Sequence, residues 1–410
     1  MGFIGADIPW TDPILLAMSI AATQEDMVFL HSSLKTDYSG RYSILAWNRE
    51  ISVQGQDFSA LPPLSEKPLF GYFSYELCSA LESIPDTAPT YIPLPRLNLV
   101  NFKHLLRFDH EKRTIEAWET MPPLPAASAP HSLEPPEISS LKSNMSLDVY
   151  LSHAQDALDG IAAGNFYQVN LTRKFYGTFK SPISSFDLYQ RLIAASPAPY
   201  SAYMRLDSVS ILSSSPELFL KIDGSTITSR PIKGTAPRHT EPEKDARQRE
   251  TLRESTKDQA ENLMIVDLMR HDLARVSEPG SVHVNELFAI DSFPTLHHLS
   301  SVVSGTLLPG KSPIDALKAA FPPGSMTGAP KISAMRWLAK KEGVDRGVYS
   351  GALGWFTRDA AEWSVVIRTL LIRDQLFEFQ VGGGIVADST PESEWQETIY
   401  KRREFFADLG

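Results

Sequence analysis

The stretch from Ile211 to Thr235 reads ILSSSPELFLKIDGSTITSRPIKGT. The pair Asp223-Gly224 divides it into two runs, residues 211–222 and 226–230, that are rich in apolar and β-branched side chains. An Asp-Gly pair between two such runs is typical of a tight β-hairpin turn, because both residues tolerate the positive φ angles that the turn requires. The stretch therefore predicts two antiparallel strands joined by a short turn.

The flanking sequence predicts helices mixed with further strands. An apolar stripe at helical spacing runs from Tyr150 to Ile161, with Ser146 placed to cap the helix and Gly164 placed to end it. Residues 166–175 alternate strictly, which is the period of a strand. Because strands come in hairpins and do not alternate regularly with helices, the pattern favours an α+β fold with largely antiparallel sheets. The other expected helices are 243–269, 314–321, 332–342 and 392–406, and the other expected strands are 349–357, 364–372 and 376–381.

The composition is that of a globular protein long enough for more than one domain. The sequence has 410 residues, 42% of them hydrophobic, and a formal net charge of −10. This charge, without any basic stripe, argues against binding to nucleic acid or to an anionic membrane. Several prolines within residues 121–136 predict an extended linker. We therefore expect an N-terminal region (1–120), a linker (121–140) and a catalytic domain (141–410).

A reducing, cytoplasmic setting is expected. Cys78 is the single cysteine, so the chain cannot form an internal disulfide. The first residues lack the basic region of a secretory signal, and no apolar run is long enough to cross a bilayer.

Lys233 is the first candidate for chemistry. It lies between Pro231, which stiffens the chain, and Gly234, which lets other groups approach. Arg230 would disfavour a second positive charge nearby and so favour the neutral amine, the form of lysine that attacks carbon. The alternative is a solvated lysine at a strand end. In a regular hairpin, Glu217 would pair with Arg230, and Lys233 would point to the other face.

Two pairs of carboxylates indicate a metal site. Asp258 and Glu261 are three residues apart in an expected helix and so share one helix face. Glu394 and Glu397 repeat this arrangement in the last expected helix. Two such faces opposite each other would supply the hard oxygen ligands that Mg²⁺ prefers. The alternative is a pair of solvated helix faces.

Two glycine-containing segments are candidate anion sites. Residues 382–384 are three consecutive glycines before the last helix, and they would let a ligand reach backbone N–H groups. Residues 324–331, GSMTGAPK, precede a helix whose N-terminus could hold a carboxylate. Neither segment has the spacing of a dinucleotide-binding fingerprint or of a P-loop.

Together these stretches resemble the family of chorismate-utilising enzymes. The resemblance covers most of residues 160–401, and a weaker match extends to 29–32 and 71–75. It implies the fold of that family, an α+β fold in which two large, mostly antiparallel sheets pack as a sandwich with helices on the outside. The segments that carry the resemblance are 167–171, 214–217, 230–235, 260–268, 297–299, 324–331, 367–370 and 382–398.

The resemblance implies roles for the candidate residues. Chorismate would be the substrate, and Glu261 and Glu397 would bind Mg²⁺ directly, while Asp258 and Glu394 would act through water. The implied catalytic residues are Lys233, Glu217 and His298, and the implied substrate contacts are Thr235, Thr327, Tyr349, Arg368, Gly382, Gly383, Gly384 and Lys401.

Lys233 indicates which reaction of the family to expect. Members that make 4-amino-4-deoxychorismate have lysine in this motif, whereas anthranilate synthases have alanine. The resemblance implies that the Lys233 amine attacks C2 of chorismate while Glu217 protonates the departing C4 hydroxyl, and that ammonia then attacks C4 and expels the lysine. Relatives that add water have a lysine where this chain has Gln168. We therefore expect a Mg²⁺-dependent, transaminase-type amination that leads to 4-aminobenzoate and folate.

Several positions depart from the family pattern. His271, Ala274 and Pro323 replace the usual Asn, Gly and Gly, although none of them removes a proposed catalytic group. His31 stands where feedback-inhibited anthranilate synthases have glutamate, so regulation by tryptophan is not expected. His298 has a simpler alternative role as a packed core histidine.

A separate subunit is expected to supply ammonia. Cys78 lies in an apolar and aromatic context, not in the glycine-rich elbow of a glutaminase nucleophile. The resemblance therefore implies a glutamine amidotransferase partner, and a separate lyase to complete 4-aminobenzoate. Two alternatives remain, an anthranilate synthase and a non-catalytic chorismate-binding subunit.

Overall fold

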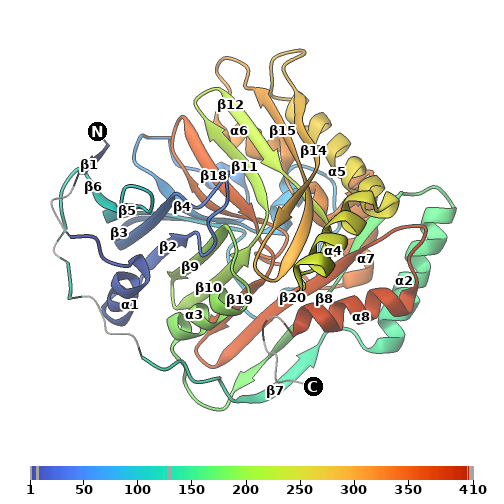
Figure 1. The fold of residues 1–410 in the computed structure, drawn as a ribbon, viewed down its shortest axis with the longest axis horizontal. Helices are drawn as coiled ribbons and strands as arrows, with labels where there is room; N and C mark the ends of the chain where they lie inside the picture. Colours follow the sequence, from blue (N-terminus) through green and yellow to red (C-terminus); the bar gives the residue numbers. More distant parts are fainter. Residues whose placement is uncertain (1, 6–8, 123, 127–130, 404, 406–410) are drawn as a thin grey trace.

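Antiparallel pairing organises the fold. In the computed structural model, which describes residues 2–5, 9–122, 124–126, 131–403 and 405, hydrogen bonds link 20 strands into one network. The paired strands within this network run antiparallel. Helices pack around it (Figure 1). The expected α+β class with antiparallel strands is confirmed, and the strands expected in two sheets are joined by pairing into one continuous network.

The elements are distributed along the whole chain. The helices are α1 (Pro13–Thr23), α2 (Leu147–Ala162), α3 (Ser185–Ala195), α4 (Pro242–Glu254), α5 (Thr256–Ala274), α6 (Pro313–Ala320), α7 (Lys331–Glu342) and α8 (Pro391–Arg402), with 3-10 turns η1 (Phe58–Ala60), η2 (Tyr75–Ala80) and η3 (Gly324–Met326). The strands are β1 (Phe3–Gly5), β2 (Met27–His31), β3 (Tyr42–Gly55), β4 (Leu69–Phe73), β5 (Leu97–Asp109), β6 (Thr114–Trp118), β7 (Ile138–Ser143), β8 (Gln168–Phe179), β9 (Tyr200–Leu206), β10 (Val209–Ser215), β11 (Leu218–Asp223), β12 (Thr226–Arg230), β13 (Ile232–Pro237), β14 (His283–Ser292), β15 (Leu296–Thr306), β16 (Gly328–Ala329), β17 (Ala352–Phe356), β18 (Ala360–Val365), β19 (Thr369–Arg373) and β20 (Leu376–Ile385).

Strands from the first 120 residues pair directly with strands from the rest of the chain. β2 pairs with β9, so that Phe29 lies opposite Tyr203, and β4 pairs with β17, so that Phe73 lies opposite Ala352. The expected division at 1–120, 121–140 and 141–410 stays a prediction, and residues 123 and 127–130 of the expected linker lie outside the described residues. The pairing means that β17 is held in place partly by the N-terminal strands.

The hairpin predicted around Asp223-Gly224 is present, but the first of its two strands is interrupted. β11 and β12 pair around the turn, and Asp223 lies opposite Thr226. The single strand expected over 211–222 is wrong, because the chain leaves the ladder at Glu217 and forms β10 and β11 separately. The expected pairing of Glu217 with Arg230 is also wrong. Leu218 lies opposite Arg230, and a register shift follows it.

The helix expected over 243–269 is divided at Ser255. This residue has an extended backbone, with φ −63° and ψ 105°, and its side chain accepts a hydrogen bond of 3.2 Å from the Asp258 backbone N–H. A serine that caps a new helix in this way satisfies a donor that the helix itself leaves unpaired. The strand expected over 364–372 is also interrupted. β18 ends at Val365 and β19 begins at Thr369, and Arg368 between them has a φ of 49°.

Other expected elements are present with small shifts of their ends. Ser146 caps α2 by accepting from the Val149 backbone N–H, as its position predicted. The last helix, α8, ends at Arg402, and residue 406 of the expected range lies outside the described residues. None of the helices in the described ranges is long and apolar enough to cross a membrane.

The largest buried apolar cluster fixes α5 against the strands. It includes Ile265 and Met269 of α5, Phe219 of β11 and Trp363 of β18, and Trp363 is only 1% exposed. Burying side chains of this size contributes about 1.5–3 kcal/mol each. Because this cluster holds one face of α5, the position of the acidic side chains near its start is set by the core.

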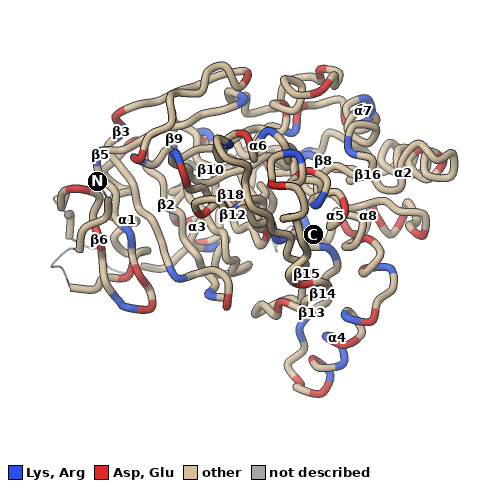
Figure 2. The backbone as a smooth tube through the Cα atoms, turned by 90° about the horizontal axis from the view of Figure 1, so that it is seen from above, with Lys and Arg blue, Asp and Glu red and all other residues tan. Residues whose placement is uncertain are grey.

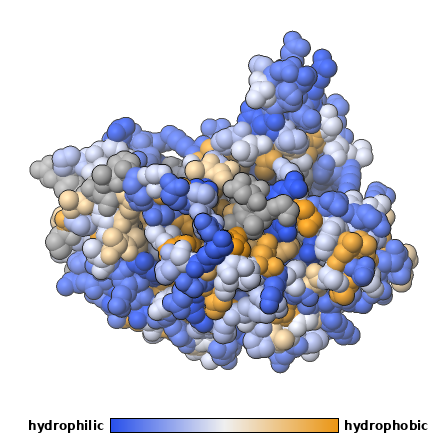
Figure 3. Space-filling model, turned by 90° about the horizontal axis from the view of Figure 1, so that it is seen from below, coloured by the Kyte–Doolittle hydropathy of each residue, from blue (hydrophilic) through white to orange (hydrophobic). Residues whose placement is uncertain are grey.

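α4 and the nearby ends of β13, β14 and β15 project from the body of the molecule (Figure 2). Within α4 only Leu252 is buried, and Figure 3 shows the projection as a mostly hydrophilic surface. A helix with so little apolar contact depends on its ends and on neighbouring strands for its position.

The helix break generates a stability prediction. Replacing Ser255 with Ala removes the cap of α5, and we expect the free energy of unfolding in urea to fall by about 1 kcal/mol. Thr256→Ala, at the exposed first position of the same helix, is the matched control and should stay within about 0.5 kcal/mol of the wild type. Equal losses in both variants would show that the capping bond does not stabilise α5.

Candidate active site

One large cavity of about 550 Å³ collects most of the candidate residues. A volume in this range suits a small organic ligand. Its wall includes residues of β8, β13, α5, β20 and α8. The chain segments just before β11 and just after β18 also contribute to it. The candidate residues that line it are Glu217, Lys233, Thr235, Asp258, Glu261, His298, Tyr349, Arg368, Gly382, Gly384, Glu394, Glu397 and Lys401.

Lys233 reaches the cavity because β13 is irregular where it follows Pro231. The register between β13 and β15 shifts between Ile232 and Thr235, and Gly234 has a φ of 91°. A Cβ atom at Gly384 of β20 would lie 3.3 Å from the Lys233 Nζ. The missing side chain at this glycine therefore leaves room for the amine beside the β20 backbone.

Arg230 does not act on Lys233 in the way that the sequence argument expected. It does not line the cavity, and its guanidinium pairs with Asp291 at 2.8 Å and with Glu286 at 3.1 Å. Arg230 and Lys233, on either side of Pro231, therefore lie in different surroundings: Arg230 in its ion pairs and Lys233 in the cavity. The expectation that Lys233 and Glu217 point to opposite faces is likewise wrong, because both line the same cavity.

Glu217 is a buried carboxyl group at the break between β10 and β11. It is 4% exposed, and burial raises its pKa to about 7, against the opposing effects of the nearby Ser325 hydroxyl and the charge of Lys233. A carboxylic acid with this pKa is protonated in a large fraction of molecules near neutral pH. The arrangement can therefore donate a proton into the cavity.

Four carboxylates from α5 and α8 meet at one side of the cavity. Burial raises the pKa of Glu261 against the opposing charges of Lys233 and Lys257, and the charges of Asp258 and Glu397 add to the rise. Glu394 has a raised pKa for the same reasons, burial and then the charge of Glu397, and its Oε2 atom is buried without a hydrogen-bond partner. The carboxylates are thus close enough to repel one another.

Gly383 allows this crowding. A Cβ atom there would lie 2.8 Å from the Oε2 of Glu394 and 3.2 Å from the carboxyl carbon of Glu397. Gly234 likewise leaves room for a carboxylate of α5, since a Cβ atom at Gly234 would lie 2.9 Å from the Cβ of Asp258. Residues with side chains at these two positions would push the carboxylates away from the backbone.

Arg173 holds α8 in its position. Its Nη1 donates to the Thr398 hydroxyl at 2.8 Å, and its guanidinium carbon lies 3.4 Å from the ring centroid of Trp395. A cation stacked on an indole ring is attracted by the negative face of the ring. Because Trp395 and Thr398 flank Glu397 on the helix, this contact also orients the acidic side chains.

Cations partly balance the carboxylates. Burial alone would raise the pKa of Glu397, but Lys401, which lies 2.6 Å away, and the more distant charges of Lys233 and Lys257 hold it below its ordinary value. Lys401 also donates to the Gly382 carbonyl at 2.7 Å. One carboxylate of the four is therefore stabilised in its charged form.

His298 both packs and faces the cavity. Its ring lies 5.0 Å from the ring of Phe293, and its Nδ1 lies 3.1 Å from the Thr235 hydroxyl. Its Nε2 has no hydrogen-bond partner, and burial lowers the pKa well below the ordinary value, so the ring is neutral. This geometry suits both a packing role and a catalytic role.

Two candidates stand outside the lining, and several lining residues were not singled out from the sequence. Thr327 is fully buried behind the wall, where its hydroxyl donates to the Gly324 carbonyl. Gly383 contacts the carboxylates from behind. Alternation along residues 166–175 could have identified Asn170, and its position next to Asp258 could have identified Lys257. The polar lining residues without an earlier assignment are Asn170, Lys257, Ser325, Gln380 and Tyr400.

The donor set suits a hard divalent cation. In the described parts of the chain, no group of three or more His, Cys, Asp or Glu side chains is already arranged as a metal-binding cluster. The carboxylates of Glu261, Glu394 and Glu397 nevertheless carry mutual repulsion and an unpartnered oxygen, which a cation between them would relieve. The residues present therefore fit Mg²⁺.

Comparisons with known proteins agree with the geometry. The family model described as chorismate binding enzyme matches residues 17–407. Aminodeoxychorismate synthase component 1 of Klebsiella aerogenes is 39% identical over 357 residues, covering 85% of this chain and 78% of the relative. Anthranilate synthase component 1 of Streptomyces coelicolor is 35% identical, covering 91% and 78%. The crystal structure of anthranilate synthase component I from Streptococcus pneumoniae matches with a TM-score of 0.79 and 26% identity, over 98% of this chain and 99% of that one.

The carboxylate cluster generates a metal prediction. Mg²⁺ should raise the melting temperature, by roughly 2–4 °C per kcal/mol of binding free energy, because it binds the folded state only. Glu261→Gln and Glu397→Gln should lose this response, because each variant removes a charged oxygen ligand. Glu392→Gln, on the exposed face of α8, is the control and should keep it. A full response in Glu397→Gln would remove this residue from the metal site.

Proposed function

The chain belongs to the chorismate binding enzyme family, and from this premise we propose that it is component 1 of an aminodeoxychorismate synthase. The reaction converts chorismate and ammonia to 4-amino-4-deoxychorismate, a transaminase-type amination on the route to 4-aminobenzoate and folate. The relatives of this name, at 38–39% identity over most of the chain, favour it over anthranilate synthase. The observation that carries the proposal is the Lys233 amine in one cavity with Glu217 and the carboxylates.

Mg²⁺ is the proposed cofactor. Glu261 and Glu397 would hold it directly, and Asp258 and Glu394 would hold its water ligands. When bound, it would neutralise the substrate carboxylate and the surrounding acidic side chains. The support for this assignment is the gathering of these partly buried carboxylates, with raised pKa values at Glu261 and Glu394 and an unpartnered oxygen on Glu394.

The ends of the substrate would be held by the cationic and backbone groups of the cavity. Arg368, at the break between β18 and β19, and Lys401, on α8, bring positive charge to the wall. The N–H groups of residues 382–384 and the Tyr349 hydroxyl would complete the contacts. An anionic substrate with two carboxylates is suited to such a wall, because each carboxylate meets a cation.

Lys233 and Glu217 would carry the chemistry. The Lys233 nitrogen forms a bond to C2 of chorismate, the ring double bonds shift, and the C4–O bond breaks as Glu217 gives its proton to the departing hydroxyl, which leaves as water. Ammonia then forms a bond to C4, the double bonds shift back, and the bond from C2 to Lys233 breaks. Two substitutions with a positioned nucleophile replace one difficult exchange.

Ammonia would come from a separate glutamine amidotransferase subunit in the cytoplasm. The relatives are named as component 1, which implies a second component. Cys78, the single cysteine, is buried, and burial raises the pKa of its thiol to about 12, so it is not an activated nucleophile. Cys78 therefore does not supply the glutaminase nucleophile, which the proposal assigns to the partner.

Anthranilate synthase is the second candidate, since a relative of that name is 35% identical. It would not use Lys233 as a nucleophile and would release a fluorescent aromatic product without an added lyase. A non-catalytic chorismate-binding subunit would consume no chorismate. The position of Lys233 beside Gly384 favours the amination of C4 over both.

The first functional prediction concerns Lys233. Purified protein with chorismate, Mg²⁺ and ammonium should give 4-amino-4-deoxychorismate by mass analysis, and chorismate without ammonium should leave a covalent adduct on the protein. Lys233→Ala should lose the adduct, because the variant lacks the amine that is proposed to attack C2. Lys221→Ala, an exposed lysine on β11, is the control. Equal product formation by Lys233→Ala would show that the lysine is not the nucleophile.

The second functional prediction concerns pH. A general acid must be protonated, and the pKa of Glu217 is raised from its ordinary value to about 7, so kcat/KM should fall as the pH rises above 7. Glu217→Gln should reduce the rate by about 10²–10⁴-fold and remove this limb. Glu76→Gln is the control for the pH profile, because Glu76 has a similarly raised pKa of about 7 but lies outside the cavity; this variant should keep the limb even if its kcat/KM is about threefold lower at every pH. If the fall of kcat/KM above pH 7 disappears in Glu76→Gln, the fall is due to Glu76 and its assignment to Glu217 is wrong.

A further inference from the structure

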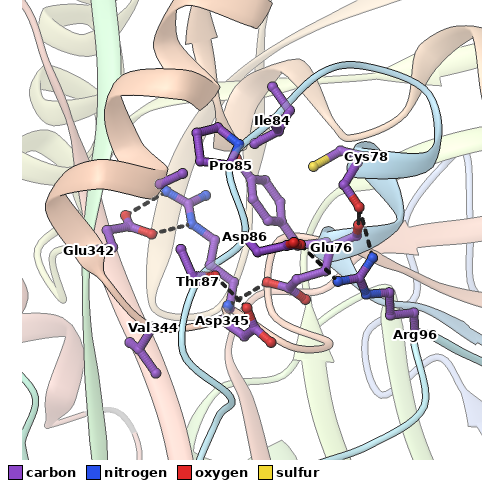
Figure 4. A pocket seen from close by; sticks show the side chains of 14 residues that line it. Glu76, Cys78, Ile84, Pro85, Asp86, Thr87, Arg96, Glu342, Val344 and Asp345 are labelled. Atoms are coloured by element: carbon purple, nitrogen blue, oxygen red, sulfur yellow. Dashed lines mark hydrogen bonds and ion pairs between the residues drawn. The ribbon is translucent and has the colours of Figure 1, made fainter. Parts of the chain in front are cut away.

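Arg346 occupies a buried position directly behind the cavity wall. It is 2% exposed, and its guanidinium carbon lies 4.6 Å from the ring centroid of Tyr75. Glu342 of α7 accepts from its Nε at 2.8 Å and from its Nη2 at 2.7 Å, which forms a fork between two planar groups. Figure 4 shows Glu342 reaching toward this guanidinium from α7. A buried charge with such a partner is stable only while the geometry is kept.

The remaining guanidinium donors hold the backbone of residues that line the cavity. Nη1 donates to the Met326 carbonyl at 2.7 Å, and Nη2 donates to the Asn170 carbonyl at 2.8 Å. Met326 and Asn170 both line the cavity, from η3 and β8. Nη1 also donates to the Ser350 hydroxyl at 3.1 Å, next to Tyr349. One side chain thus ties together three separate segments of the wall.

Glu342 extends the same network into β8. It accepts from the Thr172 backbone N–H at 3.0 Å and from the Thr172 hydroxyl at 2.7 Å. Asn170 and Thr172 are therefore both fixed from behind, one through its carbonyl and one through its N–H. The Arg346–Glu342 pair therefore holds β8 in addition to the hydrogen bonds that β8 makes with its neighbouring strands.

The N-terminal segment holds the backbone of Arg346 itself. Glu76, in η2, accepts from the Arg346 N–H at 2.6 Å and from the Gly347 N–H at 3.1 Å. The Tyr75 N–H donates to the Gly347 carbonyl at 2.8 Å. In Figure 4, Glu76 faces Asp345 from the side opposite Glu342. A segment more than 250 residues earlier in the chain therefore fixes the turn that precedes Tyr349.

The space beside Glu76 is too small for a substrate. The pocket that Glu76, Arg96 and Asp345 line has a volume of about 30 Å³, which is room for about one or two water molecules. The surrounding charged groups are paired or hydrogen-bonded: Arg96 donates to the Ser79 hydroxyl, and Thr87 donates to Asp345. The geometry is that of a support and not of a second binding site.

We propose that Arg346 is a positioning residue: with Glu342 and Glu76 it sets the substrate-facing wall formed by Asn170, Met326 and Tyr349. This inference rests on the proposed function, because it takes chorismate as the ligand of the cavity. The reacting groups Lys233 and Glu217 belong to other segments, β13 and the β10–β11 break, that the clamp does not hold. Loss of the clamp therefore affects substrate binding more than the chemical step.

The main test is Arg346→Lys, which keeps the charge but loses the planar fork. Chorismate affinity is measured by calorimetry with Mg²⁺ and without ammonium, and KM and kcat are measured with ammonium. We expect Kd and KM to rise about tenfold, the equivalent of one lost hydrogen bond to a charged group, while kcat stays within about threefold. Arg205→Lys is the control: Arg205 also donates to backbone carbonyls, those of Ala21 at 2.7 Å and Glu25 at 3.0 Å, but lies outside the cavity.

Milder variants keep the test decisive if Arg346→Lys does not fold. Ser350→Ala removes one acceptor of the guanidinium, and Glu76→Gln removes one acceptor of the backbone N–H groups. Each should raise Kd about threefold without changing kcat. A folded Arg346→Lys with unchanged Kd and KM, or milder variants that only lower the melting temperature, would overturn the proposal and leave Arg346 a purely structural residue.

The outcome is separable from that of the proposed function. If the wild type binds chorismate but releases anthranilate, the proposed function is wrong, while a tenfold weaker Kd in Arg346→Lys still supports the clamp. If the wild type makes the amino product and Arg346→Lys binds chorismate normally, the function stands and the clamp falls. A wild type that does not bind chorismate overturns both.

Discussion

Repulsion between carboxylates is the constraint on which the rest of the cavity depends. Two helices from distant parts of the chain, α5 and α8, bring acidic side chains into one partly buried site, where burial first and neighbouring carboxylates second raise the pKa values of Glu261 and Glu394. Like charges in a partly buried site cost free energy unless they are paired or share a cation. The fold accepts this cost through the hydrophobic cluster behind α5 and the Arg173–Trp395 stack behind α8. Titratable groups with perturbed pKa values that gather in one cavity are typical of functional sites.

Two parts of the cavity wall are supported differently. The reacting groups are placed by irregular β-structure, with Glu217 at the gap between β10 and β11 and Lys233 at the bulge after Pro231. The wall segments at Asn170 and Met326 are held by a buried arginine whose donors reach their backbone carbonyls. The irregular strands determine where the Lys233 and Glu217 side chains point, whereas Arg346 fixes the backbone at Asn170 and Met326. The N-terminal part contributes through Glu76 of η2 and through the pairing of β4 with β17, so its described residues help to shape a cavity that they do not line.

Local rules predicted the local parts of this structure. The Asp223-Gly224 turn, the Ser146 cap and the shared faces of the carboxylate pairs each depend on residues within four positions of one another, and the hairpin and the cap appear as expected. The break at Ser255 was missed because the polar pattern continues through it, although serine three residues before Asp258 is a recognised capping signal. The resemblance to a known family identified the residues of the cavity, because the motifs recur in order.

The parts that could not be predicted depend on long-range geometry. The register of Leu218 against Arg230 is set by bulges that no turn signal reveals. Arg346 gave no periodic signal, since its partners at 76, 170, 326 and 342 come from four separate segments. Likewise, the ion pair of Arg230 with Asp291 depends on a strand that returns about 60 residues later. Contacts of this kind follow from the fold and not from the sequence around each residue.

The claim that the crowded acidic side chains hold a divalent cation is tested most directly by crystallography with Mn²⁺, whose anomalous scattering locates the metal. Crystals grown with Mn²⁺ and chorismate should show one anomalous peak between Glu261 and Glu397, with the substrate carboxylate against it. An absent peak, or one away from α5 and α8 with Glu397 still paired to Lys401, would contradict the account.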